Sequence, residues 1–275
     1  MSTPFSLTVR GARGSMPVAG PSFIRYGGNT TCLDLALGKG ERLVIDAGSG
    51  LKSLEAVWRA EGGGASKWHL FFTHYHWDHL LGFPLFAPLH DPAGTFELHG
   101  FPSEAEGLRS ILERALQAPF FPVALNAVQS RCHYHDLDGS TVELGPLHVK
   151  SCPLNHPQGA HAYRLEHAGR AVVIATDHEC GDSAIDERLA MFAHGASTLI
   201  ADAQWTPQDA AAHHGWGHSS WRDAVALAKR AAVDKLVLFH HDPDRTDDQL
   251  DAILSEARRE FPQVEVASEG LKIDL

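Results

Sequence analysis

The stretch FFTHYHWDHLLGFP, residues 71 to 84, places three histidines and one aspartate within six positions, directly after an apolar run. His74 and His76 are separated by one residue, so in extended backbone their side chains point the same way and can bind one metal ion. Asp78 and His79 follow at the start of a predicted helix, offset enough to serve a second ion. Burying four such groups is costly unless they bind something. The stretch therefore predicts a metal site, and four surface polar residues in a turn are the alternative.

A hydrolytic two-metal centre also needs another histidine and a carboxylate that can bridge ions about 3.5–4 Å apart. Three apolar runs downstream end in suitable residues. Asn155 and His156 end the first run, Asp177 ends AVVIATD, and His240 ends KLVLFH, with His241 as the competing residue there. Three strand termini that each deliver a donor strengthen the prediction of a metal centre.

Composition limits the class of protein. The 275 residues suffice for one large domain or two small ones, and we predict a single domain over residues 1–275. The net charge of −11 argues against a broad nucleic-acid-binding face, so a long nucleic acid is an unexpected substrate. A small phosphate-bearing substrate is compatible, because bound cations can supply local positive charge. The chain shows neither a signal peptide nor an apolar run near 18 residues, and its four cysteines are scattered. We therefore expect a reduced cytoplasmic protein without a membrane segment.

The order of the predicted elements indicates an α/β fold. Short strands and turns dominate the N-terminal half, and strands alternate with helices towards the C-terminus. The predicted helices occupy residues 53–62, 80–89, 103–117, 219–232 and 246–260. Two sets of strands with helices outside them predict two mixed sheets packed together and flanked by helices, a four-layer αββα sandwich.

The sequence resembles the metallo-β-lactamase superfamily over nearly its whole length. The motifs that carry the resemblance are RGARGSMP, RLVIDAGSG, THYHWDH, LNHPQG, ATDHE, GWGHSS and LVLFHHDP. The resemblance implies the αββα sandwich of that family, with a dinuclear site between the two sheet edges. It implies one ion held by His74, His76 and His156, and a second held by Asp78, His79 and His240. It also implies that Asp177 bridges the two ions.

The segment GWGHSSWRDAVALAKRAAVDKLVLFHHDP is similar to the ribonuclease Z and cyclic-phosphodiesterase branch. In that branch a histidine-serine-threonine stretch precedes a helix, and the resemblance implies that His218 assists catalysis. His218 and Ser219 match, and Ser220 replaces the threonine; a glycine loop with a helix-capping serine is the alternative. The chain departs from tRNA-maturation enzymes, because it lacks their glycine-rich, basic arm and has only Asp202 where they show a histidine-glutamate pair.

The predicted function is a dinuclear metal-dependent phosphodiesterase that acts on a small phosphodiester or a cyclic nucleotide. A hydroxide between the ions would attack phosphorus. Asp78 would hold or deprotonate that nucleophile, and His218 would protonate the leaving oxygen. An ester or lactone hydrolase on the same site is one alternative, and a non-catalytic metal-binding sensor module is another. We expect two divalent ions per chain, zinc first and manganese or iron next. A homodimer is expected from the resemblance alone.

Weaker candidates lie in loops around the predicted metal ligands: Asp46, Arg13, Ser15, Asn29, His178 and Asp202. Asp46 could orient a ligand histidine, although a turn-forming aspartate explains it equally well. Arg13, Ser15 and Asn29 sit in loops that border the site in the resembled family. Contact with substrate is one interpretation of these residues and of His178, and ordinary turn chemistry is the other.

Overall fold

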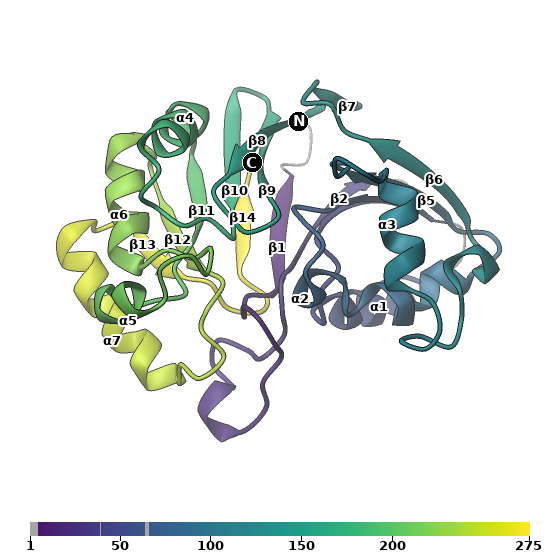
Figure 1. Ribbon diagram of the computed structural model, residues 1–275, viewed down its shortest axis with the longest axis horizontal. Helices are drawn as coiled ribbons and strands as arrows, with labels where there is room; N and C mark the ends of the chain where they lie inside the picture. The colour runs from purple at the N-terminus through teal and green to yellow at the C-terminus, as the bar shows by residue number, and fades with distance from the viewer. Residues whose placement is uncertain (1–4, 39, 64–65) are drawn as a thin grey trace.

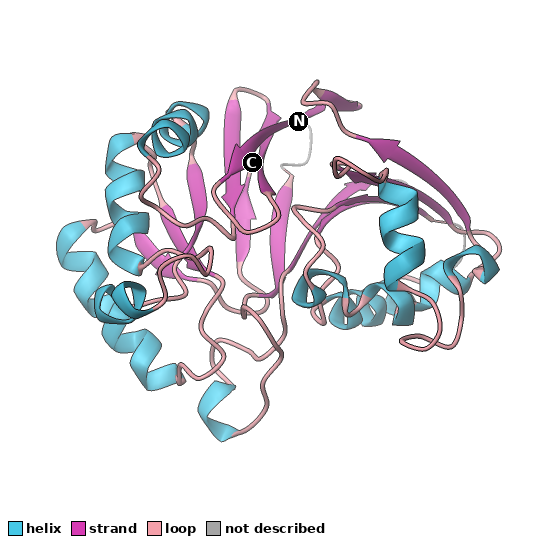
Figure 2. Cartoon of the chain, viewed as in Figure 1, coloured by secondary structure: helices cyan, strands magenta, loops and turns pink. Residues whose placement is uncertain are grey.

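A computed structural model describes residues 5–38, 40–63 and 66–275. Two seven-stranded sheets face each other, and helices cover their outer faces (Figures 1 and 2). The predicted αββα sandwich of mixed sheets is therefore confirmed.

The first sheet has the strand order β14-β1-β2-β3-β4-β5-β6. Strands β1 to β3 pair antiparallel, as do β14 and β1, whereas β3 to β6 pair parallel. Its strands are β1 (Ser6–Gly11), β2 (Cys32–Gly38), β3 (Glu41–Ile45), β4 (Lys67–Phe71), β5 (Thr95–Gly100), β6 (Arg131–Asp136) and β14 (Lys272–Asp274).

The second sheet has the order β13-β12-β11-β10-β9-β8-β7. Strands β7 to β10 pair antiparallel and β10 to β13 pair parallel. Its strands are β7 (Val142–Leu144), β8 (Leu147–Leu154), β9 (Ala160–His167), β10 (Arg170–Ala175), β11 (Thr198–Asp202), β12 (Leu236–Phe239) and β13 (Val264–Val266).

The helices segregate by sheet, and each group covers the sheet that its neighbours in sequence form (Figure 1). Helices α1 (Leu51–Ala60), α2 (Trp77–Leu80) and α3 (Leu108–Ala115) lie over the first sheet. Helices α4 (Ser183–Ala193), α6 (Trp221–Arg230) and α7 (Asp247–Glu260) lie over the second, and α5 (Pro207–Ala212) lies in a connecting loop. Within the described part of the chain, no helix is long and apolar enough to cross a membrane.

Three apolar layers hold these parts together, because strand residues alternate between the two faces of a sheet. In β4, Phe71 packs between the sheets, whereas Trp68 and Leu70 pack under the helices of the first sheet. In β10, Val172 and Ile174 face the space between the sheets, and Val173 faces the helices of the second.

Some predicted helix limits were wrong. The helix predicted over 80–89 is instead α2 followed by two 3₁₀ turns, Phe83–Leu85 and Ala87–His90, because a proline lies early in each turn. The helix predicted over 103–117 begins at Leu108, where the Asp136 carboxylate of β6 accepts a hydrogen bond from the Leu108 amide. This cap comes from a distant strand and has no local signal.

The sheet topology brings the ends of five strands to one place. Strands β3 and β4 run parallel, so both end at the same edge of the first sheet. Strand β9 runs antiparallel to both β8 and β10, so those two point the same way, and β11 and β12 run parallel to β10. Clusters of histidine and aspartate join side chains from the loops after β4, β8, β10, β11 and β12, so these loops meet at one end of the sandwich.

Candidate metal centre

The loop after β4 and the loop after β8 supply a first group of three histidines. His74, His76 and His156 offer ring nitrogens that lie within 4.8 Å of one another. The Nδ1 atom of His76 lies 3.2 Å from Nε2 of His156. The three residues that the sequence predicts for the first ion are therefore brought together by the structure.

A second group gathers beside the first. Nε2 of His240 lies 3.2 Å from Oδ2 of Asp78, and Nε2 of His79 lies 3.3 Å from the same oxygen. Asp177 stands between the groups: its Oδ2 lies 3.3 Å from His79 Nε2 and its Oδ1 lies 3.7 Å from His74 Nε2. His241 is directed elsewhere, because its Nε2 lies 2.8 Å from the carbonyl oxygen of Ala267.

These separations fit a metal ion. Two donors bonded tetrahedrally to one ion at about 2.0–2.1 Å lie roughly 3.3 Å apart. Five donor pairs in the cluster show 3.2 or 3.3 Å: His76 with His156, His79 with Asp78, His240 with Asp78, His79 with Asp177 and His240 with Asp177. The Nε2 atoms of His74 and His79 are buried and have no hydrogen-bond partner among the described residues.

The other nitrogen of each ring faces a hydrogen-bond acceptor. His79 Nδ1 lies 2.8 Å from Asp46, His240 Nδ1 lies 2.9 Å from the side-chain oxygen of Gln204, and His156 Nδ1 lies 2.9 Å from the carbonyl oxygen of Gly217. A nitrogen that donates to such an oxygen carries the proton, so the Nε2 atom of a neutral ring presents a lone pair.

The same pattern extends to the remaining rings. His76 Nε2 faces the side-chain oxygen of Gln158 at 3.0 Å, and His74 Nδ1 faces the Thr73 hydroxyl at 3.1 Å. Thr73 itself donates to Asp46, so its oxygen is free to accept from His74. Lone pairs that face carboxylate oxygens repel them unless a cation lies between, and this donor set therefore suits a divalent metal.

The charged groups of the centre shift one another's pKa values. Burial would lower the pKa of His79, but Asp177 and Asp78 outweigh it and raise that pKa, so a bound ion would displace the His79 proton. Burial would raise the pKa of Asp78, but the attraction of His79 outweighs it and lowers that pKa. Burial, with His79 as the next cause, lowers the pKa of His74, and burial also lowers the pKa of His156. Ionised carboxylates and neutral imidazoles are the forms that bind metal.

Backbone strain is concentrated at the centre. Asp46, Asp177 and His240 have φ values of 58°, 59° and 60°, in the left-handed region that side chains other than glycine rarely adopt. Ser15 and Gln158 share this conformation and also contact ligand residues. Strain of this kind persists where surrounding contacts enforce it, and it clusters at functional sites.

His218 lies at the margin of the cluster, on the loop before α6. Its Nδ1 lies 2.8 Å from Asp202 Oδ2 and 4.0 Å from Asp177 Oδ1, and its ring stacks on that of His240 with centroids 4.8 Å apart. Burial would lower the pKa of His218, but Asp202 raises it to about 9. Bound cations would oppose this rise. Asp202 also accepts hydrogen bonds from the amides of Asp177 and Ser219, so it joins the loops after β10 and β11 to the His218 loop.

The weaker candidates separate into two sets. Asp46 supports His79, and the amide of Ser15 donates to Asp78 at 2.8 Å, so both touch ligand residues. Arg13 is fully buried and its guanidinium donates to backbone carbonyls of Gly27, Asp242 and Arg245, which leaves a substrate no access to it.

Asn29 and His178 also face away from the cluster. The Asn29 side chain bonds to Ser49 and Glu269. His178 is buried, with one ring nitrogen 3.2 Å from the Asn155 amide and the other 3.0 Å from Asp186 of α4. The interpretation of Arg13, Asn29 and His178 as substrate contacts has no geometric basis here.

Several supporting residues were missed by sequence reasoning. Gln204 and Thr73 orient ligand histidines, and Glu179 accepts hydrogen bonds from the amides of Gly215 and Gly217. Gly217 has φ +89°, and a Cβ there would collide with His156. In the sequence, only the glycine pair in GWGHSS pointed to this support. It indicates a turn but does not show that the turn contacts His156.

Comparisons with known proteins agree with this geometry. A family model described as the beta-lactamase superfamily domain matches residues 41–241. The chain belongs to the metallo-β-lactamase superfamily. A ribonuclease Z of Methanosarcina acetivorans is 27% identical over 281 residues, which cover 86% of this chain and 90% of that protein. A ribonuclease Z of Bradyrhizobium diazoefficiens is 26% identical and covers 96% of this chain and 98% of its own. The metallo-β-lactamase fold protein YhfI of Bacillus subtilis aligns with a TM-score of 0.74 at 21% identity, over 99% of each chain.

The predicted resemblance, including its ribonuclease Z-like branch, is confirmed, and so is the prediction of a metal-dependent hydrolase. The clusters of histidine and aspartate agree with metal binding, whereas the number and identity of the ions stay predictions. The expectation that a long nucleic acid is an unlikely substrate gains no support, because these relatives are named as ribonucleases.

Proposed function

We propose that this protein is a dinuclear phosphodiesterase that cleaves a small phosphodiester. The observation that carries the proposal is the orientation of the ligand histidines: they donate outward to the protein and aim their free nitrogens at Asp78 and Asp177. Such an arrangement favours two cations that share Asp177. Zinc suits these imidazole and carboxylate donors best, and manganese or iron would also fit.

The ions would supply an activated water and neutralise the phosphoryl oxygens when bound. The residues of the chain divide the remaining tasks. Asp78, fixed by the Ser15 amide, would orient the attacking water and accept its proton. His218, held by Asp202, would donate a proton to the leaving oxygen. Asp202 would keep the His218 ring in one orientation.

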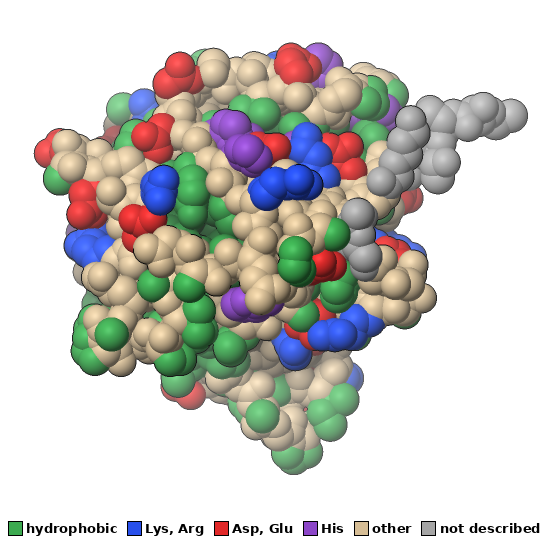
Figure 3. Space-filling view, turned by 90° about the vertical axis from the view of Figure 1, so that its right-hand side faces the viewer, with side chains coloured by type: hydrophobic (Ala, Val, Ile, Leu, Met, Phe, Trp, Pro, Cys, Tyr) green, Lys and Arg blue, Asp and Glu red, His purple; other side chains and the backbone are tan. Residues whose placement is uncertain are grey.

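A small substrate is preferred over a long RNA on grounds of charge. The net charge is −11, and phosphate backbones are bound mainly by basic surfaces. On the side of the molecule that carries α1, α3 and β6, basic side chains are scattered among acidic ones (Figure 3). The relatives named ribonuclease Z favour RNA instead, so RNA belongs in the test.

The test is a substrate panel with metal analysis. Protein purified without chelator should contain about two ions per chain and should hydrolyse bis-p-nitrophenyl phosphate or a cyclic nucleotide, and chelation should abolish that turnover. Faster cleavage of a precursor tRNA than of any small diester would replace the proposed substrate class. Turnover of acyl lactones alone would identify a lactone hydrolase, and bound metal without any turnover would favour a sensor module.

A further inference from the structure

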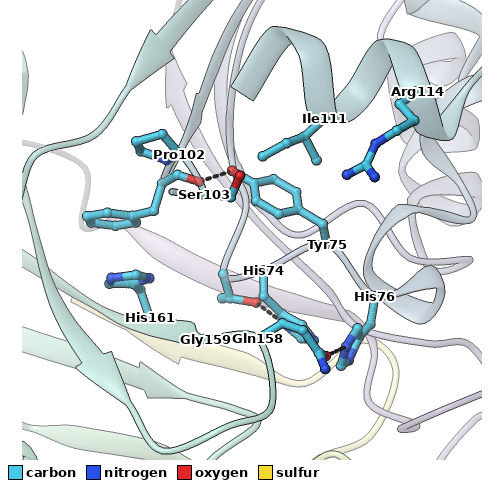
Figure 4. A pocket seen from close by; sticks show the side chains of 12 residues that line it. His74, Tyr75, His76, Pro102, Ser103, Ile111, Arg114, Gln158, Gly159 and His161 are labelled. Carbon is cyan, nitrogen blue, oxygen red and sulfur yellow. Dashed lines mark hydrogen bonds between the residues drawn. The ribbon is translucent and has the colours of Figure 1, made fainter. Parts of the chain in front are cut away.

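A cavity of about 350 Å³ opens beside the candidate metal centre (Figure 4). Helix α3, the segment after β5 and the turn between β8 and β9 enclose it, and His74 and His76 form its inner border. Because two predicted metal ligands line it, a substituent attached to a phosphorus atom at the centre could enter it directly.

The wall of this cavity is uncharged over most of its surface. Phe101, Pro102 and Ile111 present carbon atoms, and the hydroxyl of Tyr75 is already donated to the Phe101 carbonyl at 2.6 Å. His161 stacks on Phe101, with ring centroids 3.4 Å apart and planes 7° apart. Burial lowers the pKa of His161 to about 4, so this ring is neutral at pH 7.

One cationic side chain stands at the margin. Arg114 is the only lysine or arginine among the described residues that line the cavity. Its guanidinium pairs with Glu106 at 2.8 Å, and 67% of its side chain is exposed. A positively charged substituent would meet this guanidinium, whereas a neutral aromatic substituent would not be repelled by it.

The cavity and His218 adjoin different predicted metal ligands. None of the described lining residues belongs to the loop before α6 that carries His218, and the His218 ring contacts His156 and His240 instead. A leaving group that takes its proton from His218 therefore departs from the side away from the cavity. The substituent that stays on phosphorus is the one directed into the cavity.

We propose that this cavity binds the retained substituent of the phosphodiester and selects a neutral aromatic group. This inference rests on the proposed function. Apolar cavities of about 150 Å³ already bind benzene, so 350 Å³ accommodates one aromatic group. This volume lies near the lower end of the range for ligand-binding pockets, so the cavity holds one substituent and not a nucleic-acid strand.

The test keeps the leaving group constant and varies only the retained group. The three substrates are bis-p-nitrophenyl phosphate, methyl p-nitrophenyl phosphate and p-nitrophenyl phosphorylcholine, which retain an aromatic, a methyl and a cationic group. We expect kcat/KM for the aromatic diester to exceed both others by at least about tenfold, since apolar contacts in a pocket are worth that much or more. Cleavage of none of the three contradicts the proposed function, whereas equal cleavage of all three contradicts the cavity proposal alone.

Two arginines on α3 provide a matched pair of variants. Arg114 and Arg109 are similarly exposed and each pairs with a glutamate, but only Arg114 lines the cavity. Arg114→Ala should raise kcat/KM for the choline diester relative to the methyl diester by about threefold or more, as removal of a nearby like charge predicts. Arg109→Ala should leave this ratio unchanged. Equal effects of both variants, or no effect of either, would contradict a role for Arg114 in selection.

A third variant fills the cavity. Ile111→Trp should raise KM for the aromatic diester by a larger factor than KM for the methyl diester, with metal content unchanged. If the aromatic preference survives in a folded, metal-loaded Ile111→Trp protein, the aromatic group binds elsewhere. If this variant does not fold, the substrate series and the arginine pair still decide the proposal.

Discussion

Each histidine of the candidate centre has one ring nitrogen directed at the protein and the other at the cluster. Asp177 is the residue on which both groups converge, with oxygens 3.3 Å from His79 and His240 and 3.7 Å from His74.

Asp177→Asn is the informative variant, because asparagine tolerates the φ of 59° that alanine would strain. We expect metal content to fall below two ions per chain and turnover to fall at least about 100-fold. Circular dichroism should show an intact fold, because the hydrophobic layers are untouched. Unchanged metal content and turnover would remove Asp177 from the bridging position.

His218 is distinguished from a ligand by what its loss should leave intact. His218→Ala should retain both ions and lower kcat about 10²–10⁴-fold for a cyclic nucleotide, whose alkoxide leaving group needs a proton, the usual contribution of a general acid. His194→Ala is the control, since His194 is exposed and belongs to none of the described histidine and aspartate clusters, and it should change neither quantity. His218 and Asp202 also lie close enough to Asp177 and His240 to bind an ion. Loss of metal in His218→Ala would assign His218 as a ligand and overturn its role as a proton donor.

At the scale of elements, apolar patterning predicted the strands that carry the site and missed those whose patterns are atypical. Strand β6 has the sequence RCHYHD, with His133 and His135 on the face where the neighbouring β5 carries Glu97 and His99. Helix α4 follows a glycine and is capped by Asp182, but its apolar contacts are small alanines and one leucine. Neither segment shows the periodicity from which an element is recognised.

The inner face of β4, β5 and β6 contains a histidine stack with a consequence for acid stability. His99 is buried between Phe71 and His135, faces His69 and Lys67 as well, and has no hydrogen-bond partner on either ring nitrogen. Burial is the largest cause that lowers the pKa of His99 to about 3, and the neighbouring His135, His69 and Lys67 lower it further. A histidine with a depressed pKa stabilises the fold above its unfolded pKa of about 6.5, and this contribution is lost as the pH falls below that value.

His99→Phe should therefore reduce the acid sensitivity of the fold. Between pH 7.5 and pH 5, His99 alone should cost about 2 kcal/mol of unfolding free energy in the wild-type protein. Phenylalanine keeps the stacking and does not titrate, so the variant should lose correspondingly less, as urea unfolding at both pH values would measure. His194→Gln, at an exposed position, is the control and should behave like the wild-type protein. Parallel losses in all three proteins would mean that His99 is not the responsible group.

At the scale of the whole molecule, the donors of the centre could be predicted and their supports could not. Each donor follows a strand, and parallel strands of a sandwich end together, so the spacing of His74, His156, Asp177 and His240 already implies convergence. Gln204 and Gly217 reach the histidines from other elements, so their contacts depend on how distant loops pack. Thr73 is the chain neighbour of His74, and Asp46 from the loop after β3 orients its hydroxyl. No spacing pattern in a single sequence identifies such partners.

The convergence of so many loops on one centre makes the stability of the whole molecule depend on metal. Without ions, the Nε2 atoms of His74 and His79 lack partners among the described residues, Asp78 and Asp177 repel each other, and the strained Asp177 and His240 would lack the ions that they are proposed to bind. An ion at about 100 times its dissociation constant stabilises the native state by about 2.7 kcal/mol. For a chain of roughly this size, that corresponds to an increase in Tm of about 5–10 °C per ion.

Chelation should lower Tm by at least this amount, and zinc should restore it, as differential scanning fluorimetry would show. Asp177→Asn should respond less than the wild-type protein, because it binds metal more weakly. An unchanged Tm after chelation that demonstrably removes the ions would mean that the loops are held by protein contacts alone.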